Sequence, residues 1–363
     1  MAPIKKTTNR TLFIIFLLSA LVSLQSPGAE VQVKPEILIN NLNHPWSVVF
    51  LDDKQLLISE RNGDLLLFDE GKKIILDLPI VDIYATGQGG LLDLALPPNH
   101  KKTGWIYLSY SQTNDDFRST TALTRFQLKN NQITNWQLLY VAKPYSGNSQ
   151  HFGGRIAFDK LGFVYLSVGD RGNRHFAQKT TNDIGKILRL NLDGSIPSNN
   201  PFNNAIYSYG HRNPQGLIYL DNHLIAHEHG PRGGDELNIV QKGVNYGWPV
   251  ISYGKEYISG RQVGIGTHKE SMAQPKYYWT PSIAPSGLAG LRKNEKIILF
   301  VGSLKFKELV QLTLKKQQVL NERKLFNNRF GRIRDVKIYK NYLYLLTDSS
   351  NGQLIKISLG ALL

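Results

Sequence analysis

Residues 342–359, YLYLLTDSSNGQLIKISL, show the pattern that decides the fold. An apolar strand-like run is followed by a polar turn with a glycine and then by a second apolar run, which is typical of β-structure. The pattern occurs six times in all, and neighbouring copies lie roughly 45 to 75 residues apart. The other five copies begin at Leu56, Trp105, Phe163, His223 and Ile297.

Six copies at this spacing predict an all-β fold, a six-bladed β-propeller with four-stranded antiparallel blades. The shortest spacing is close to the length of one propeller blade, and the longer spacings leave room for loops. Propellers arrange their blades around a central channel. The alternative is a β-sandwich or barrel whose hairpins happen to be similar. No low-complexity linker interrupts the chain, so we expect one propeller domain over residues 35–363.

The N-terminus has a different composition. Lys5, Lys6 and Arg10 precede an apolar run over residues 12–24, and small residues follow. This is the layout of a secretory signal peptide, so we expect residues 1–29 to be cleaved and the protein to be periplasmic or secreted. An uncleaved membrane anchor is the alternative. The apolar run is short for a membrane span, so we do not expect stable insertion into a membrane.

The chain has 363 residues, a net charge of +15 and no cysteine. The missing cysteines exclude disulfides and thiolate metal sites. An excess of positive charge suits nucleic acid, an anionic surface or an anionic ligand. Secretion argues against nucleic acid, so we expect no nucleic-acid partner.

Four cationic residues lie in predicted connections between strands. Arg332 and Arg334 are two residues apart in GRIRDV, which places both side chains on one face of a strand. Lys305 lies in the polar turn of the fifth copy, and Arg212 lies in SYGHRNPQGL. Each alone is most simply a solvated surface charge. Because the connections of a propeller gather at the ends of its channel, together they indicate a site for an anion.

Two further segments carry candidate chemistry. HEHGPRGGDE, residues 227–236, combines carboxylates with a Gly-Pro step whose carbonyls suit calcium. The alternating His227 and His229 lack a third nitrogen or thiolate ligand for a transition metal, and a turn held by Asp235 is the structural alternative. His151, just before a predicted strand, is a candidate general base.

Five segments in fixed order resemble the soluble pyrroloquinoline-quinone (PQQ)-dependent aldose sugar dehydrogenases of the glucose/sorbosone dehydrogenase family. The resemblance extends over essentially the whole chain after the signal. It implies a six-bladed propeller that holds PQQ and calcium, oxidises aldose sugars at C1 to lactones, and passes electrons to an external acceptor, a quinone or a cytochrome. The five segments are HFGGRIAFDKLGFVYLSVGD (151–170), SYGHRNPQGL (208–217), HEHGPRGGDELNIVQKGVNYGWP (227–249), GSLK (302–305) and GRIRDV (331–336).

The resemblance also implies residue roles. His151 is similar to the general base for the anomeric hydroxyl, Arg212 to the residue that steadies charge on the quinone oxygen, and Asp170 to a residue on the substrate side. The implied calcium ligands are the carbonyls of Gly230 and Pro231 beside the cofactor, and Glu236 and Tyr246 at a second, structural ion. The positions implied to contact the cofactor are Gln88, Arg212, Asn213, Tyr257, Ser303, Leu304, Lys305, Arg332, Ile333 and Arg334.

The sequence departs from the glucose-oxidising relatives in two respects. His175 stands where some of them carry a sugar-binding glutamine, and the loops are shorter, so we expect broad aldose specificity and a monomer. Two other function classes are a calcium-dependent lactonase, which needs several carboxylate or amide ligands around one metal, and a non-catalytic propeller that binds a partner. His151 together with the set of cations favours the dehydrogenase.

Overall fold

The structure is a computed structural model that describes residues 1–3, 34–79 and 82–363. The predicted signal peptide, residues 1–29, lies outside the described residues except for the first three. In the part of the chain that is described, no helix is long and apolar enough to span a membrane.

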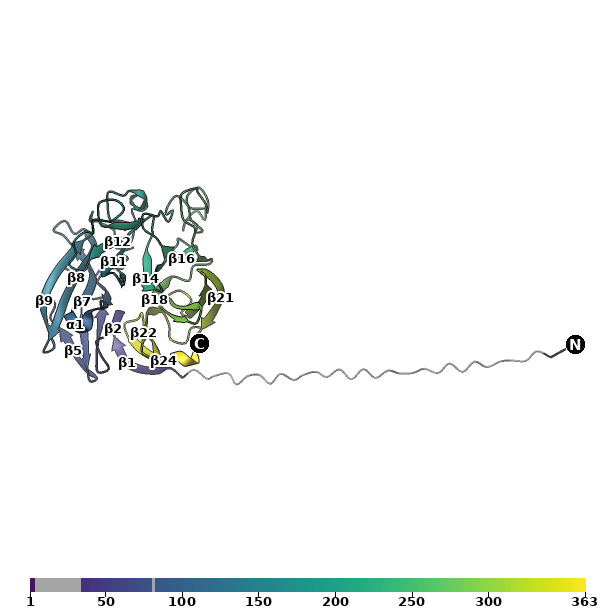
Figure 1. Ribbon diagram of the computed structural model, residues 1–363, viewed down its shortest axis with the longest axis horizontal. Helices are drawn as coiled ribbons and strands as arrows, with labels where there is room; N and C mark the ends of the chain where they lie inside the picture. Colours follow the sequence, from purple (N-terminus) through teal and green to yellow (C-terminus); the bar gives the residue numbers. More distant parts are fainter. Residues whose placement is uncertain (4–33, 80–81) are drawn as a thin grey trace. The chain divides into compact units, whose positions relative to one another are not determined.

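From Glu36 onward, the chain folds into six four-stranded antiparallel sheets, which confirms the predicted six-bladed propeller (Figure 1). The first blade contains β2 (Pro45–Phe50), β3 (Gln55–Glu60), β4 (Leu65–Asp69) and β5 (Lys72–Leu76). The second contains β6 (Leu91–Ala95), β7 (Ile106–Thr113), β8 (Ser119–Lys129) and β9 (Gln132–Val141). The third contains β10 (Ile156–Phe158), β11 (Phe163–Val168), β12 (Lys186–Asn191) and β13 (Ile206–Tyr209).

The remaining blades follow in chain order. The fourth contains β14 (Pro214–Leu220), β15 (His223–Glu228), β16 (Asp235–Val240) and β17 (Tyr277–Trp279). The fifth contains β18 (Pro285–Lys293), β19 (Lys296–Ser303), β20 (Leu309–Lys315) and β21 (Gln318–Leu325). The sixth contains β22 (Ile333–Tyr339), β23 (Tyr342–Thr347), β24 (Gly352–Ser358) and β1 (Glu36–Leu42). The described helices are short: α1 (His100–Thr103), η1 (Arg174–Gln178) and η2 (Leu359–Ala361).

The last blade joins the two ends of the propeller. Strand β1 pairs antiparallel with β24, with Glu36 opposite Lys356 and Ile37 opposite Ile355. The first strand of the propeller therefore completes the sheet formed by its last three strands, and the two elements run side by side in Figure 1. This pairing closes the ring, because β1 belongs to the sixth blade and the chain continues from it directly into β2 of the first blade.

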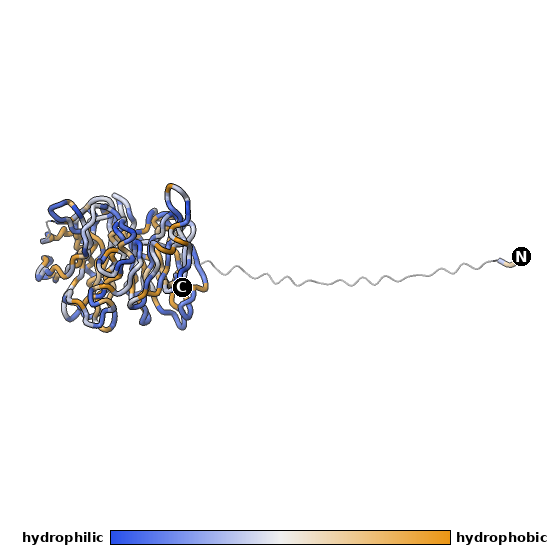
Figure 2. The backbone as a smooth tube through the Cα atoms, turned by 90° about the horizontal axis from the view of Figure 1, so that it is seen from above, coloured by the Kyte–Doolittle hydropathy of each residue, from blue (hydrophilic) through white to orange (hydrophobic). Residues whose placement is uncertain are grey.

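Strand β4 shows why these sequences form blades. Leu65 and Leu67 point to one face and pack against residues of the second blade, whereas Leu66 and Phe68 point to the other face and pack against the sixth blade. All four are buried. A strand buried on both faces reads as a continuous apolar run, and each buried side chain of this size contributes roughly 1.5 to 3 kcal/mol. Apolar and hydrophilic stretches accordingly alternate along the tube in Figure 2.

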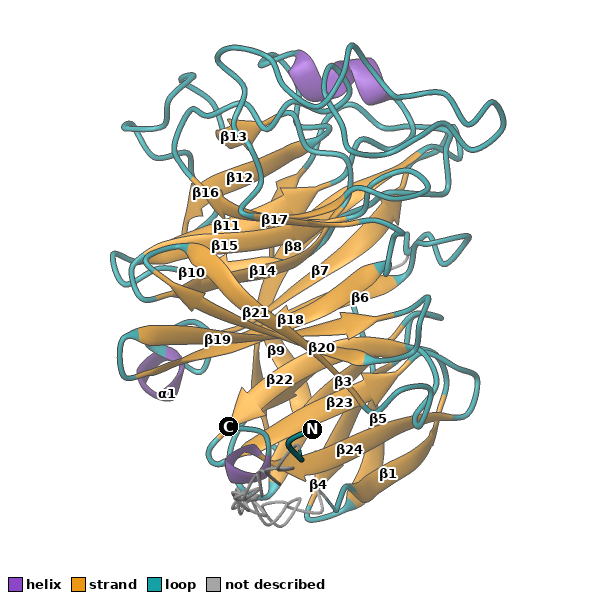
Figure 3. Cartoon of the chain, turned by 90° about the vertical axis from the view of Figure 1, so that its right-hand side faces the viewer, coloured by secondary structure: helices purple, strands orange, loops and turns teal. Residues whose placement is uncertain are grey.

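The repeated segments correspond to the second and third strands of each blade, as in β3–β4 and β23–β24. In an antiparallel blade, the connection between strands two and three lies at the same end as the connection to the next blade. All twelve of these connections therefore lie at one end of the channel. One of them, the connection between β11 and β12 that contains η1, extends beyond β12 and β13 in Figure 3.

Candidate active site

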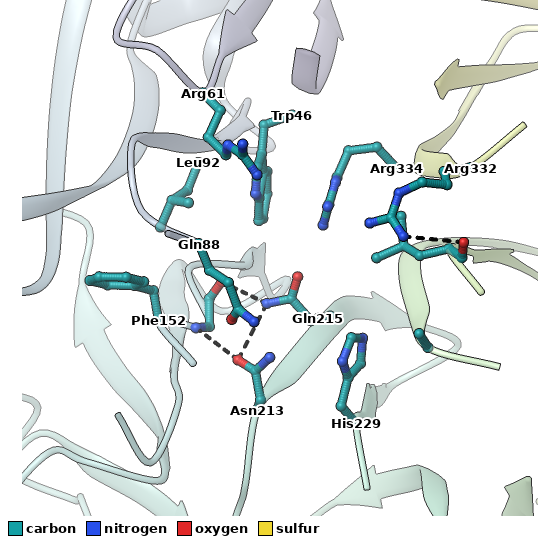
Figure 4. Close-up of a pocket in the computed structure, with 13 residues that line it drawn as sticks. Trp46, Arg61, Gln88, Leu92, Phe152, Asn213, Gln215, His229, Arg332 and Arg334 are labelled. Carbon is teal, nitrogen blue, oxygen red and sulfur yellow. Dashed lines mark hydrogen bonds between the residues drawn. The ribbon is translucent and has the colours of Figure 1, made fainter. Parts of the chain in front are cut away.

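A cavity of about 200 Å³ lies at this end of the channel, and three arginines line it. Arg332 and Arg334 lie on one side, and Trp46, Leu92 and Phe152 contribute apolar surface on the other (Figure 4). Asn213, Gln88 and Leu304, which the resemblance implied as cofactor contacts, line the same cavity. The third arginine is Arg61.

Arg332 and Arg334 converge on one carboxylate. Nη2 of each donates to Oδ2 of Asp348 at 2.8 Å, and Nδ1 of His44 lies 3.2 Å from the other oxygen. Burial alone would raise the pKa of Asp348, but the charges and hydrogen bonds of the two arginines hold it well below its usual value. One carboxylate against two guanidinium groups leaves the wall net positive. Further donors of both arginines remain available to an anion.

Arg155 contacts two residues that line this cavity, Trp46 and Arg334. Its Nη1 donates to Asp335 at 2.8 Å and to Asp93 at 3.2 Å, and its Nη2 donates to the carbonyl of Arg334 at 3.2 Å. The guanidinium also lies 4.0 Å from the centre of the Trp46 ring. These contacts join the first, second, third and sixth blades at the channel and fix the positions of Trp46 and Arg334.

A second cavity of about 300 Å³ shares Gln88 with the first and contains a histidine–carboxylate pair. Nδ1 of His151 lies 2.6 Å from Oδ1 of Asp170, and Nε1 of Trp248 donates to Oδ2 of Asp170 at 2.7 Å. The backbone N–H of His151 donates to Oε1 of Gln88 at 2.8 Å. Gly169 permits this arrangement because a Cβ there would collide with the carbonyl of His151.

The protonation states of this pair follow from its surroundings. Burial lowers the pKa of His151, and the hydrogen bond to Asp170 opposes this only in part. Burial alone would raise the pKa of Asp170, but the hydrogen bond from His151 and the charge of Arg212 lower it overall. An ionised Asp170 accepts a hydrogen bond from the Nδ1–H of a neutral His151, which leaves the lone pair of Nε2 available as a base.

Arg212 is nearly buried and lines the same cavity. Its backbone N–H donates to Glu228 at 2.6 Å, and its Nη1 donates to the carbonyl of His229 at 3.1 Å. The guanidinium lies 5.4 Å from the centre of the Trp248 ring. These contacts fix a positive charge next to His151.

The residues implied for calcium lie close together in the fourth blade. Glu236 is opposite Glu228 on adjacent strands, and burial together with the charge of Glu228 raises the pKa of Glu236 to about 8. A divalent cation would relieve this repulsion, so Glu236 fits a calcium site. Tyr246 and Gly230 line the small cavity beside it. The described residues contain no group of three or more histidine, aspartate or glutamate side chains that could hold a metal, so carbonyl oxygens would have to supply the remaining ligands.

The structure places the other implied residues less centrally. Tyr257, which is exposed, and Pro231 line the His151 cavity. Three of the implied residues line neither cavity. Ser303 is buried, and its hydroxyl donates to the Ile283 carbonyl. Lys305 is exposed, and Ile333 lies in the hydrophobic core.

Sequence reasoning missed several lining residues. Arg61 lies in the polar turn of the first repeat, SERNGD, so its position in the repeat could have revealed it. Arg174 and Trp248 both line the His151 cavity, whereas His175 is exposed and does not. No local signal marks Trp248, because its partner Asp170 is 78 residues away.

The fold and site are those of a six-bladed propeller with a cation-lined cavity beside a buried histidine–carboxylate pair, an arrangement suited to an anionic ligand next to a base. The chain belongs to the glucose/sorbosone dehydrogenase family, whose model matches residues 42–356. It is 38% identical to the aldose sugar dehydrogenase YliI of Escherichia coli, over 94% of this chain and 98% of that protein.

Two solved structures are also similar. The apo form of the E. coli soluble aldose sugar dehydrogenase matches with a TM-score of 0.85 at 38% identity, over 90% of this chain and 99% of that one. The PQQ-bound form of an aldose sugar dehydrogenase from Streptomyces coelicolor matches with a TM-score of 0.74 at 26% identity, over 90% and 99% of the two chains.

Proposed function

We propose that this protein is a PQQ-dependent dehydrogenase that oxidises aldose sugars at C1 to lactones with the assistance of calcium. The observation that carries the proposal is the buried His151–Asp170 pair, which faces a cavity that shares Gln88 with the cavity lined by arginines. The named activities of the E. coli relative and the bound cofactor of the Streptomyces structure support it.

The arginine-lined cavity suits a flat molecule with several carboxylates. Arg61, Arg332 and Arg334 would hold its acidic groups, and Trp46 and Phe152 offer apolar ring surface to its faces. Burying such an anion without cations would cost several kcal/mol per charge, roughly. When bound, PQQ supplies the acceptor for the hydride that leaves C1 of the sugar. The Gly230 and Pro231 carbonyls would hold the calcium ion beside the cofactor, and Glu236 and Tyr246 would hold a second, structural calcium ion.

Residues of this chain would accept the proton that the sugar loses. Nε2 of His151 takes the proton of the anomeric hydroxyl as the C1–H bond breaks, so that the sugar loses one proton and one hydride and becomes a lactone. Asp170 stabilises the imidazolium that forms, and Trp248 fixes the carboxylate in place. Arg212 adds a preset positive charge where negative charge develops during the reaction.

An external quinone or cytochrome would take the electrons from the enzyme. The protein would act as a periplasmic or secreted monomer once residues 1–29 are removed. Residues 35–363 would form the catalytic domain. Ten residues line the His151 cavity, and His175 is not among them. We therefore propose broad aldose specificity rather than selection for glucose.

The test is reconstitution. The purified chain, supplied with PQQ and calcium, should reduce an artificial electron acceptor when given a panel of aldoses. A parallel titration with PQQ, followed by absorbance with and without calcium, measures cofactor binding separately. PQQ binding without turnover on any aldose would contradict the dehydrogenase, and no binding at all would contradict the cofactor assignment.

A further inference from the structure

A separate cavity of about 340 Å³ lies between the fourth and fifth blades, away from His151. Aromatic side chains of the β17 segment and of Phe306 form its walls, together with three charged residues of the fifth blade. The lining residues include Tyr277, Trp279, Phe306, Glu308, Glu322 and Lys324.

Glu308 is the feature that points to a ligand. Its side chain is only 6% exposed, and its Oε1 makes no hydrogen bond with any residue that the structure describes. The ammonium of Lys324 lies 3.6 Å from that oxygen, beyond the usual hydrogen-bond distance. A buried carboxylate oxygen without a donor is costly, because it has lost water and gained no replacement.

The charged groups lie along one face of the β20–β21 hairpin. Lys324 is opposite Val310, and Glu322 is opposite Leu312, so the two are separated by two residues and share a face. Glu308 precedes Val310 by two residues. Glu322 is already oriented, because Nε1 of Trp279 donates to its Oε2 at 2.7 Å. The face thus presents two carboxylate acceptors, Glu308 and Glu322, and one ammonium donor, Lys324, beside aromatic rings.

The charges on this face select the ligand chemistry. Glu308 Oε1 and Lys324 Nζ, 3.6 Å apart, leave no room for an atom between them, so a ligand would contact the two side chains from the cavity. A hydroxyl group can donate to a carboxylate and accept from an ammonium, whereas a cation would compete with Lys324 and an anion would be repelled by two glutamates. Tyr277 and Phe306, which are half-buried at this cavity, offer aromatic surface to the C–H groups of a sugar ring. We propose that this interblade cavity is a second saccharide-binding site, for a neutral sugar ring.

The site is distinct from the candidate active site, because no residue lines both, although neighbouring residues of two segments line the two cavities. Ile283 and Phe306 line the interblade cavity, whereas Ala284 and Leu304 line the arginine cavity. Segment 282–284 is held by Asp235, whose Oδ2 accepts hydrogen bonds from Ser282, Ile283 and Ala284. The inference needs neither PQQ nor turnover, so it stands independently of the proposed function.

The experiment measures sugar binding to the purified full chain without added PQQ, by calorimetry and ligand-observed NMR. The probes are glucose, maltose and maltotriose, with choline as a cationic competitor. The variants are Glu308→Gln and Lys324→Met, with Lys316→Met as a matched control, because Lys316 is an exposed lysine of the same hairpin that does not line the cavity. His151→Ala reports on the active site.

We expect Glu308→Gln and Lys324→Met each to weaken saccharide binding by about ten-fold, and Lys316→Met and His151→Ala to leave it unchanged. Tighter binding of maltotriose than of glucose would identify an oligosaccharide chain as the source, and equal binding a free sugar. If Glu308→Gln does not fold, the exposed Lys324 position still carries the test. Absence of saccharide binding, unchanged binding in the Lys324 variant, displacement by choline, or loss only in His151→Ala would each overturn the inference.

Discussion

Nδ1 of His151 lies 2.6 Å from Oδ1 of Asp170, and this contact determines which nitrogen of the ring can act as a base. Asp170 is ionised because the hydrogen bond of His151 and nearby positive charges outweigh its burial. It therefore accepts a hydrogen bond from Nδ1–H, so that the lone pair lies on Nε2. The second oxygen of Asp170 is held by Trp248, so the carboxylate cannot rotate without losing a hydrogen bond.

Replacing the base should separate chemistry from binding. In His151→Ala, we expect kcat to fall by about 10² to 10⁴, because the anomeric proton has no acceptor. Affinity for PQQ should change little, since the arginines that would hold the cofactor remain. Steady-state kinetics and an absorbance titration measure the two effects. A variant with wild-type kcat would remove His151 from the mechanism.

The pH dependence should follow the lowered pKa of His151. A base works in its neutral form, so kcat should stay high as pH falls below the ordinary histidine value of about 6.5 and should decline only through the depressed pKa of His151. A decline of kcat that begins above pH 6.5 would contradict the assignment of His151 as the base.

The Asp170→Asn variant should lower kcat by about 10² to 10⁴, because an amide no longer fixes the proton on Nδ1 of His151. The control is Trp248→Phe, which removes one N–H donor to Asp170 and should lower kcat by about ten-fold.

The two arginines of GRIRDV should govern cofactor affinity. Replacing Arg332 and Arg334 together by alanine removes several charge-assisted hydrogen bonds to an anion, and we expect the Kd for PQQ to rise by at least about 100-fold. Arg329→Ala is the matched control, an exposed arginine of the same connection. Circular dichroism should accompany the titration as a check on folding, because Asp348 loses both of its arginine partners. An unchanged Kd in the folded double variant would show that these charges do not hold the cofactor.

The propeller could be predicted because each blade repeats one pattern. Strands two and three of every blade carry long apolar runs around a polar turn, as in β3–β4 and β23–β24, so six copies are visible. The innermost strands are harder to identify. Strand β10 has only three residues, too few for alternation to be recognised. The number of blades therefore followed from the sequence, whereas their inner edges required the structure.

The site was less accessible to sequence reasoning, because its contacts cross between blades. Arg332 and Arg334 were correctly placed near each other, but Asp348, which balances them, lies in the turn of the last repeat and carries no signal of its own. Lys305 was grouped with these arginines by its place in a turn, yet it is exposed and lines neither cavity. Turn position locates the correct end of the channel but does not decide where a side chain points.

Calcium should stabilise the protein through Glu236. Its residue lies opposite Glu228 on the adjacent strand and is half-buried, so a divalent cation between the two carboxylates would replace a repulsion with two attractions. Thermal unfolding followed with and without excess calcium should show an increase in Tm for the wild type, by mass action. Glu236→Gln should reduce this increase by at least half, while Glu295→Gln, at a surface ion pair, should not. An equal increase in all three proteins would place the ion elsewhere.

Arg155 should couple the stability of the propeller to cofactor binding. It is buried and pairs with Asp93 and Asp335, so Arg155→Met would leave two buried carboxylates with Lys337 as their remaining charged partner, at 3.4 and 3.6 Å. Removing one member of such a buried network costs about 3 to 5 kcal/mol, and Tm should fall accordingly. Affinity for PQQ should fall as well, because Arg155 holds the carbonyl of Arg334.

The comparison that isolates this effect is Arg118→Met, which changes an exposed arginine of the second blade and should alter neither Tm nor the Kd for PQQ. Differential scanning calorimetry and the absorbance titration measure the two quantities on the same samples. If Arg155→Met lowers Tm but leaves the Kd unchanged, the network supports the fold without positioning the arginine wall. If Tm is also unchanged, the charged network of Arg155, Asp93, Asp335 and Lys337 contributes no net stability to the channel, and the ring is held by strand pairing and apolar packing alone.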